Sequence, residues 1–200
     1  PGPHMIAALI LAAGGSRRLG RPKQLEPWGS TTLLSHIIDL VEAFPVDETW
    51  VVVGAELDRV VNEIGARPVG IVQNPDWESG LASSLRVGLD ALTRLSKADG
   101  VLVFLGDQPA VRADVVTALI EKHKRSTAMA IVPKYRYSRG NPVLIDRRLW
   151  PRLMSLEGDE GAQRLLQAHS EWVEEVWFDS LPPRDIDTQA DVEELRPRRT

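Results

Sequence analysis

The stretch that decides the fold runs from Ala7 to Lys23 and reads AALILAAGGSRRLGRPK. Its apolar part, Ile6–Ala13, is short and rich in small residues, which is typical of a buried β-strand. Gly14 and Gly15 then let the backbone turn sharply and bring its N–H groups close to a bound group. Four basic side chains follow, namely Arg17, Arg18, Arg21 and Lys23. Together they indicate an anion site that suits a triphosphate, although a solvated basic loop after a glycine turn explains the same residues.

The glycine spacing matches neither of the two common phosphate-binding fingerprints. The dinucleotide fingerprint needs G-x-G-x-x-G, whereas this chain has G-G-x-x-x-x-G from Gly14 to Gly20. The P-loop needs a lysine directly after its last glycine, followed by serine or threonine, but here Lys23 comes three residues after Gly20 and Gln24 follows it. The phosphate interpretation therefore depends on residues elsewhere in the chain.

Length and composition limit the classes of function. A chain of 200 residues suits one α/β domain with a real core, which we expect over residues 5–196. The net charge of −4 argues against general nucleic-acid binding. The absence of cysteine excludes disulfides, thiolate metal sites and a cysteine nucleophile, and it fits a reducing cytoplasm, where we expect the protein. No apolar run approaches the length of a membrane span, so we expect no membrane partner. Residues 1–4, before Met5, have the character of an expression-tag remnant.

Strand and helix patterns alternate along the chain. Short apolar or β-branched runs predict strands at residues 6–13, 49–54, 70–74, 100–105 and 128–132. Helical apolar spacing predicts helices at residues 31–41, 56–64, 83–95 and 113–124. The 100–105 run is the most apolar, so we expect that strand at the centre of the sheet. This alternation indicates an α/β fold with a mostly parallel sheet covered by helices on both faces.

The last third of the chain is less regular. The pattern predicts an added strand over 141–146, with Pro142 at an edge or at a strand start, and a second extended segment over 172–178. Short helices are expected over 161–168 and 188–195. Polar residues before the helices predict caps at Ser30 or Thr31 for the first and at Asp187 or Thr188 for the last.

Ligands of open parallel sheets bind beyond the carboxyl ends of the strands. Asp107 directly follows the 100–105 strand, and a carboxylate there, facing a phosphate-binding loop, is well suited to hold Mg²⁺. The alternative is an aspartate that caps a helix or forms a turn. Asp187 has the same two interpretations, as a second metal carboxylate or as a cap.

Several other polar and aromatic residues lie on the same predicted loops. Ser83 and Ser84 follow Gly80 at a helix start, where they either cap the helix or face a base and ribose. Trp28 and Trp77 lie on the predicted site loops and could flank a ring. The spacing of three histidines predicts ordinary surface or core residues and no ligand cluster, namely His36, His123 and His169.

Residues 11–25, LAAGGSRRLGRPKQL, resemble the L-A-A-G-x-S-x-R-[ML]-G-x-x-K signature of MobA-like nucleotidyltransferases. Five further segments resemble motifs of the same family, in the family's order: Ser79–Leu85, Gly106–Pro109, Gly140–Val143, Gly158–Ala162 and Asp185–Thr188. They cover nearly all of the chain after Met5. The sequence is most similar to the branch of molybdenum cofactor cytidylyltransferases.

The resemblance implies a single nucleotidyltransferase domain with a Rossmann-like three-layer sandwich fold. It implies transfer of CMP from CTP to the terminal phosphate of molybdopterin, with Mg²⁺ as cofactor and pyrophosphate as second product. A transient contact with a molybdoenzyme or its maturation factor would follow. The alternatives are the same reaction with GTP, transfer to another phosphorylated small molecule, and a non-enzymatic carrier of molybdenum cofactor.

The resemblance also assigns residues to roles. Nucleotide contacts fall to Ala12, Ala13, Gly14, Gly15, Ser16, Arg18, Lys23, Gly80, Ser83 and Ser84. Catalysis falls to Arg18, Lys23 and Asp107, the metal to Asp107 and Asp187, and acceptor contacts to Asn141 and Asp159. Many members of the cytidylyltransferase branch have a histidine where this chain has Asn141, so the acceptor is the part of the assignment that the motifs define least.

Overall fold

A computed structural model describes residues 4–197, so three residues of the expected tag remnant, 1–3, lie outside the described residues. The strand β1 (Ile6–Leu11) is buried along its whole length and pairs in parallel with a strand on either side. A strand that is covered on both faces must be apolar throughout, which is the pattern of the opening stretch. β1 therefore anchors the sheet, as its sequence predicts.

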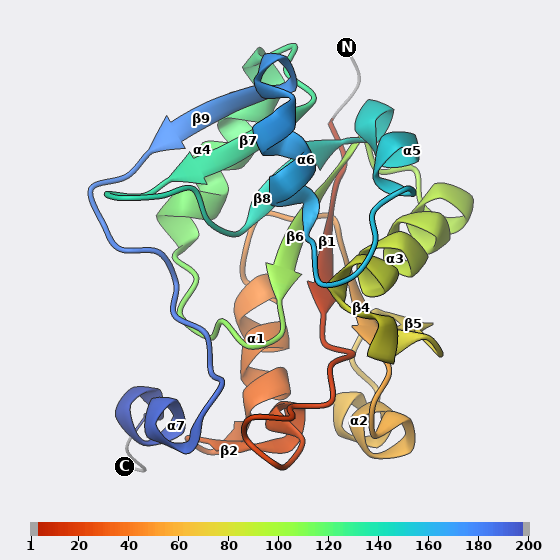
Figure 1. Ribbon diagram of the computed structural model, residues 1–200, viewed down its shortest axis with the longest axis vertical. Coiled ribbons are helices and arrows are strands. Elements are labelled where there is room, and N and C mark those ends of the chain that lie inside the picture. The colour runs from red at the N-terminus through yellow and green to blue at the C-terminus, as the bar shows by residue number, and fades with distance from the viewer. Residues whose placement is uncertain (1–3, 198–200) are drawn as a thin grey trace.

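Seven strands form the main sheet (Figure 1). Their spatial order is β5 (Gly70–Gln73), β4 (Glu48–Val53), β1, β6 (Gly100–Leu105), β8 (Val143–Asp146), β7 (Ala130–Lys134) and β9 (Val173–Trp177). Only β8 runs antiparallel to its two neighbours. The predicted mostly parallel sheet is confirmed, and β6 is its fourth strand, in the central position that its apolar character predicts.

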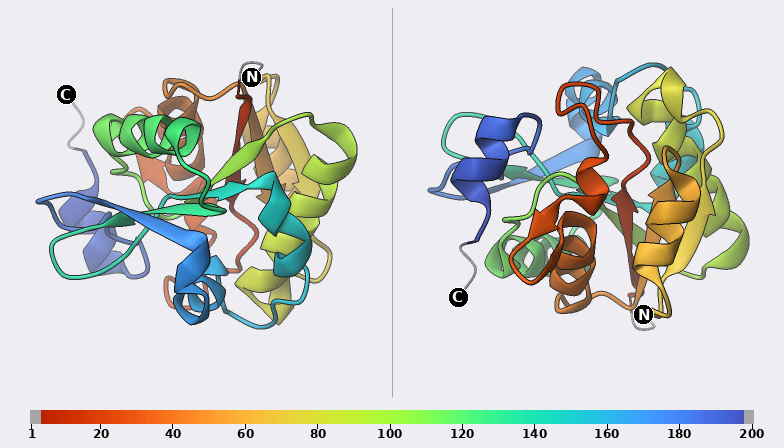
Figure 2. Two further views of the ribbon diagram at one scale, coloured as in Figure 1. Left: turned by 90° about the horizontal axis from the view of Figure 1, so that it is seen from above. Right: turned by 90° about the horizontal axis from the view of Figure 1, so that it is seen from below.

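Helices cover both faces of the sheet (Figure 2). One face packs against α1 (Leu33–Glu42), α2 (Leu57–Ile64) and α4 (Ala113–Arg125), and the other against α3 (Leu81–Leu95), α5 (Trp150–Leu153) and α6 (Ala162–Ala168). A small hairpin of β2 (Pro27–Trp28) and β3 (Thr31–Thr32) precedes α1, and α7 (Gln189–Leu195) ends the described chain. This is the predicted Rossmann-like three-layer arrangement. Among residues 4–197, none of the helices has the length and apolar character needed to cross a membrane.

The N-cap of α1 differs from the predicted residues, whereas the N-cap of α7 agrees with the prediction. α1 is capped by Thr32, whose hydroxyl accepts a hydrogen bond from Ser35 N at 3.2 Å. The predicted caps, Ser30 and Thr31, were wrong because Thr31 and Thr32 form β3, so the helix begins two residues later than the predicted residue 31. α7 is capped by Thr188, as predicted, in a capping box with Asp191.

Two boundaries also differ from the sequence pattern. The strand predicted over 128–132 lies at 130–134, because Ala128 N donates to Ser126 Oγ at 2.9 Å in a turn before the strand begins. The predicted strand over 141–146 begins only after Pro142, and it lies inside the sheet between β6 and β7. A proline has no N–H to donate to a neighbouring strand, so β8 starts at Val143.

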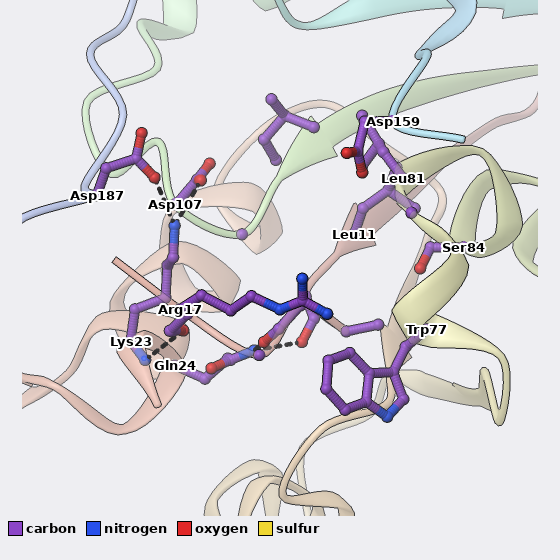
Figure 3. A pocket seen from close by; sticks show the side chains of 18 of the residues that line it. Leu11, Arg17, Lys23, Gln24, Trp77, Leu81, Ser84, Asp107, Asp159 and Asp187 are labelled. Atoms are coloured by element: carbon purple, nitrogen blue, oxygen red, sulfur yellow. Dashed lines mark hydrogen bonds and ion pairs between the residues drawn. The ribbon is translucent and has the colours of Figure 1, made fainter. Parts of the chain in front are cut away.

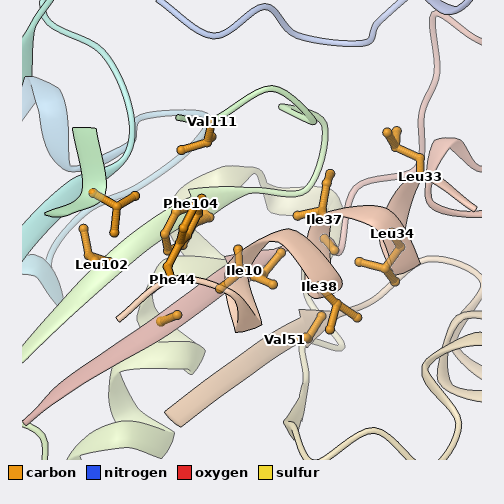
Figure 4. Packing of buried hydrophobic residues seen from close by; sticks show 14 of the residues in the cluster. Ile10, Leu33, Leu34, Ile37, Ile38, Phe44, Val51, Leu102, Phe104 and Val111 are labelled. Atoms are coloured by element: carbon orange, nitrogen blue, oxygen red, sulfur yellow. The ribbon is translucent and has the colours of Figure 1, made fainter. Parts of the chain in front are cut away.

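The core between α1 and the sheet contains two stacked aromatic rings, Phe44 and Phe104 (Figure 4). Their centroids are 5.9 Å apart with an interplanar angle of 20°, and Phe104 is 1% exposed. We expect Phe104→Ala to lower the free energy of unfolding by about 3–5 kcal/mol, because it removes a buried ring and leaves a cavity. Urea unfolding measures this, and Leu95→Ala, at a side chain that is 70% exposed, is the control.

The control should change stability by less than about 0.5 kcal/mol, because an exposed side chain on a helix end makes few contacts to lose. Equal effects of the two substitutions would contradict the assignment of Phe104 to the core.

Candidate functional site

The carboxyl ends of β1 and β6 open into a cavity of about 600 Å³. Its walls come from the loop after β1, the start of α3, the loop after β6 and the segment before α7 (Figure 3). The lining residues are Leu11, Ala12, Ala13, Gly14, Gly15, Ser16, Arg17, Arg18, Lys23, Gln24, Trp77, Glu78, Gly80, Leu81, Ser84, Leu105, Gly106, Asp107, Asp159, Asp185 and Asp187. Most of the residues that the sequence singles out therefore line one cavity.

The loop after β1 is held in a fixed shape by side chains from its own far end. Gln24 is buried, and its Nε2 donates to the carbonyl oxygens of Ala12 and Gly14 at 2.8 and 2.9 Å. Ser16 adopts a left-handed backbone conformation (φ 54°), and its Oγ accepts from Lys23 N at 2.9 Å. These contacts leave the loop preorganised for an anion. The sequence alone did not reveal this structural role of Gln24. The one indication was its position as an uncharged amide within a basic segment.

An indole ring covers the loop from the other side. A Cβ atom at Gly15 would lie 2.7 Å from Cζ3 of Trp77, so only glycine fits beneath that ring. Trp77 also lines the cavity, as the sequence suggested for a residue on a site loop, whereas Trp28 lines a different cavity, on the far side of the loop after β6.

Four charged side chains from three distant parts of the chain meet at one end of the cavity. Lys23 Nζ lies 3.0 Å from Asp107 Oδ2 and 3.0 Å from Asp187 Oδ1 (Figure 3). Arg18 Nη2 lies 2.8 Å from the other oxygen of Asp187. The two segments that carry the aspartates are themselves joined, because Ile186 N donates to Asp107 O at 2.9 Å.

The charges at this end of the cavity are only partly balanced. Burial raises the pKa of Asp107, even though the neighbouring Lys23 ammonium acts in the opposite direction. Burial alone would lower the pKa of Lys23, but its contacts with Asp107 and Asp187 outweigh that effect and raise it. Asp107 Oδ1 is buried and has no hydrogen-bond partner among the described residues. A further positive charge beside Asp107 would therefore be stabilised.

Asp107 and Asp187 fit the needs of a divalent cation. Within residues 4–197 no group of three or more His, Cys, Asp or Glu side chains could hold a metal by itself. Mg²⁺, however, takes one or two carboxylates and completes its coordination with water and phosphate oxygens. Two aspartates beside an anion-binding loop, one with an unsatisfied oxygen, suit a cation that binds together with a triphosphate.

The two serines after Gly80 differ in their placement. Asn74 Nδ2 donates to Ser83 Oγ at 2.8 Å and to Ser84 Oγ at 2.9 Å. Ser84 lines the cavity, whereas Ser83 does not. The Ser83 hydroxyl instead donates to Gly80 O at 2.7 Å. The N-cap of α3 is Gly80, with no side-chain cap, so neither serine has the capping role that was the alternative. Asn74, which the sequence did not single out, orients both.

The two residues expected to contact an acceptor lie in adjoining cavities. Asp159 lines the main cavity, and a Cβ atom at Gly80 would lie 2.7 Å from Asp159 Oδ1, which shows how tightly its loop packs against the start of α3. Asn141 lines a smaller cavity of about 170 Å³ beside the main one. Figure 3 shows Asp159 on the side of the site away from Lys23.

The histidines are separate, as predicted. His36 Nε2 lies 3.0 Å from Pro109 O, His123 is buried with Nε2 3.1 Å from Asp146 Oδ2, and His169 stacks on Trp172. None of the three lines the main cavity.

An anion-binding loop and paired aspartates at the carboxyl edge of a parallel sheet place the chain in the class of α/β proteins that handle nucleotides. Sequence comparison agrees. The chain is 32% identical over 192 residues to a nicotine blue oxidoreductase of Paenarthrobacter nicotinovorans, covering 92% of each chain. It is 28% identical over 173 residues to the purine catabolism protein PucB of Bacillus subtilis, covering 83% of this chain and 82% of PucB.

Among solved structures, the fold is similar to that of Rv0371c from Mycobacterium tuberculosis, with a TM-score of 0.86 at 32% identity over 96% of this chain and 97% of that one. A structure of Rv0371c in complex with manganese gives a TM-score of 0.81 at 29% identity, with 96% and 98% covered. The family model of the MobA-like NTP transferase domain matches residues 8–173. The chain belongs to this family of nucleotidyltransferases, which confirms the resemblance seen in its motifs.

The shape of the loop after β1 depends on the two hydrogen bonds that the Gln24 side chain donates to it. We expect Gln24→Leu to lower the free energy of unfolding by about 1–3 kcal/mol, because the buried carbonyl oxygen of Ala12 and the partly buried one of Gly14 lose their donor. We also expect faster amide hydrogen exchange over residues 12–20, which mass spectrometry measures. Gln167→Leu, at an exposed position of α6, is the matched control and should leave exchange in the loop unchanged. Unaltered exchange in the Gln24 variant would contradict this role.

Proposed function

We propose that the protein is a Mg²⁺-dependent nucleotidyltransferase that moves CMP from CTP to the terminal phosphate of molybdopterin and releases pyrophosphate. The observation that carries the proposal is the placement of Lys23 between Asp107 and Asp187, at the end of the glycine loop. Family membership supports the reaction class, and the sequence motifs of the cytidylyltransferase branch favour CTP and molybdopterin.

In this proposal the triphosphate lies along the loop after β1. Backbone N–H groups of Gly14–Ser16 and the side chains of Arg18 and Lys23 bind the phosphates. The base and ribose lie toward Ala12, Gly80 and Ser84, on the side of the cavity that Trp77 closes. Asn74 fixes the Ser84 hydroxyl through its side-chain amide, which also donates to the Ser83 hydroxyl.

The reaction needs no protein nucleophile. An oxygen of the acceptor phosphate attacks the α-phosphorus in line, the bond from the α-phosphorus to the bridging oxygen breaks, and pyrophosphate leaves with that electron pair. Lys23 and Arg18 stabilise the charge on the phosphates, and the fixed loop positions the triphosphate for attack. A divalent cation held by Asp107 and Asp187 would supply further charge neutralisation at the α-phosphate and the leaving group.

Pyrophosphate release tests the donor and the reaction together. We expect release with CTP, Mg²⁺ and molybdopterin, and slower release with GTP, ATP or UTP in place of CTP. Faster release with GTP than with CTP would show that GTP is the donor. Release only with a different phosphorylated small molecule would show that this molecule, and not molybdopterin, is the acceptor. Binding of molybdopterin without pyrophosphate release from any of the four nucleotides would favour the non-enzymatic carrier.

The carboxylate of Asp107 should be essential for turnover. We expect Asp107→Asn to lower kcat by about 10²–10³-fold, because the site would lose one of the two carboxylates proposed to hold the cation that stabilises charge in the transition state. Steady-state pyrophosphate release measures this, and circular dichroism checks that the fold is retained. Asp114→Asn, at a side chain that is 56% exposed and paired with Arg112 on α4, is the control and should leave kcat unchanged. Turnover near the parent value in Asp107→Asn would remove this residue from the mechanism.

A further inference from the structure

Residues 178–188 form a strap, which runs from the end of β9 to the start of α7 without a helix or strand (Figure 1). The strap carries Asp187, whereas Asp107 lies on the loop after β6. A cation held by both carboxylates therefore requires a fixed distance between two separate pieces of irregular chain. Such segments have no hydrogen-bond ladder of their own, so the ties between the strap and the loop decide that distance.

One tie joins the two backbones beside the aspartates. Ile186 N donates to Asp107 O at 2.9 Å, and Ile186 is fully buried, at 0% exposed. Successive side chains of an extended segment point to opposite sides. Ile186 accordingly packs into the core, while its neighbours Asp185 and Asp187 both line the main cavity. This tie fixes one point of the strap against the loop.

A second tie is made by the side chains of the residues that flank the first. Gln108 follows Asp107, and its Nε2 donates to Asp185 Oδ1 at 2.7 Å. The loop that carries Gln108 starts from a fixed place, because Gly106 N donates to Leu11 O at 2.8 Å. Gln108 therefore connects the strap to the end of the sheet.

Packing alone does not account for an amide at this position. Gln108 is 6% exposed, and its Oε1 is buried without a hydrogen-bond partner in the described part of the chain. A buried polar atom without a partner lowers stability, and a methionine of similar length would avoid that loss. The contribution of the amide is therefore the hydrogen bond from its Nε2 to Asp185.

The two ties do not use the atoms that a cation would bind. Lys23 also bridges the two segments, with its Nζ 3.0 Å from one oxygen of Asp107 and 3.0 Å from one oxygen of Asp187. That bridge occupies the carboxylates that the cation would need. The backbone tie uses a carbonyl oxygen and the side-chain tie uses Asp185, so both remain available when a cation binds.

We propose that Gln108 and Asp185 are positioning residues that set the distance between the two metal carboxylates and thereby the affinity for the divalent cation. The inference rests on the proposed function, in which Asp107 and Asp187 hold that cation. Asp185 acts in it as a hydrogen-bond acceptor and not as a third ligand. Mg²⁺ demands near-ideal octahedral geometry with short bonds to oxygen, so even a small change in the spacing of its carboxylates lowers affinity.

Binding of Mn²⁺ alone tests the inference without turnover, because Mn²⁺ prefers the same oxygen ligands as Mg²⁺. Electron paramagnetic resonance of the free ion gives the Kd. We expect Gln108→Met and Asp185→Ala each to raise the Kd for Mn²⁺ about 10-fold, since each removes a partner that orients the ligands. Both substitutions break the same hydrogen bond, so the double variant should raise the Kd little further.

Two further variants separate this role from others. Asp185→Asn keeps an oxygen that accepts from Gln108, so it should recover most of the affinity lost in Asp185→Ala. Asp179→Ala is the matched control on the same strap, because it removes an ion pair with Arg136 at 2.8 Å from a side chain that is 89% exposed. It should bind Mn²⁺ as the parent protein does.

Urea unfolding of each variant identifies any general loss of stability. If Gln108→Met disturbs the fold, Asp185→Ala, at an exposed position, still decides the question. A merely structural role of the pair would lower stability and leave the Kd for Mn²⁺ unchanged.

Three results would overturn the inference. The first is parent-like Mn²⁺ affinity in Asp185→Ala, and the second is an Asp185→Asn variant that binds as weakly as Asp185→Ala, which would assign the effect to charge. The third is a parent protein that binds no Mn²⁺. Failure of the proposed reaction has a different signature, since the parent would then bind Mn²⁺ and yet release no pyrophosphate from any nucleotide.

Discussion

The contact of the Lys23 ammonium with Asp107 and Asp187 is the interaction on which the site depends. It joins residues 84 and 164 positions apart in the chain, from the loop after β1, the loop after β6 and the segment before α7. Pairing stabilises these partly buried charges, and the pKa of Asp107 is nevertheless raised, because its burial outweighs the effect of the neighbouring Lys23 ammonium. The same imbalance makes the place favourable for a cation that accompanies a triphosphate.

The sheet register brings these groups together. β1 pairs with β6 so that Leu11 lies opposite Leu105, the last residues of both strands. The two loops therefore leave the sheet side by side, with the glycine loop from one strand and Asp107 from the other. β4 on the far side of β1 completes the support, since Ala12 N donates to Val52 O at 2.9 Å. Because β1 is held by a strand on either side, the loop that follows it starts from a fixed position, and the charged side chains on that loop are placed accordingly.

Much of this arrangement follows from local sequence, and the remainder depends on tertiary contacts. Apolar runs, helical spacing and the rule that sites lie beyond strand ends were enough to predict the parallel sheet, the central β6 and the position of Asp107 facing the loop after β1. The antiparallel insertion of β8 was not predictable, because strand order is decided by packing and not by the segment's own pattern. Gln24 and Asn74 were missed for a similar reason, since an amide becomes structural only where folded carbonyls or hydroxyls surround it.

The two ends of the site place different demands on the sequence. In the proposed function the charged end binds a triphosphate and a cation, groups that are the same for any nucleotide donor, so a family could keep this end while its members differ elsewhere. Relatives that match 92% and 83% of this chain bear names as different as nicotine blue oxidoreductase and purine catabolism protein, although they are 32% and 28% identical to it. A shared fold therefore does not specify the acceptor. Under the proposed function, specificity for the acceptor therefore has to come from residues that the triphosphate does not touch.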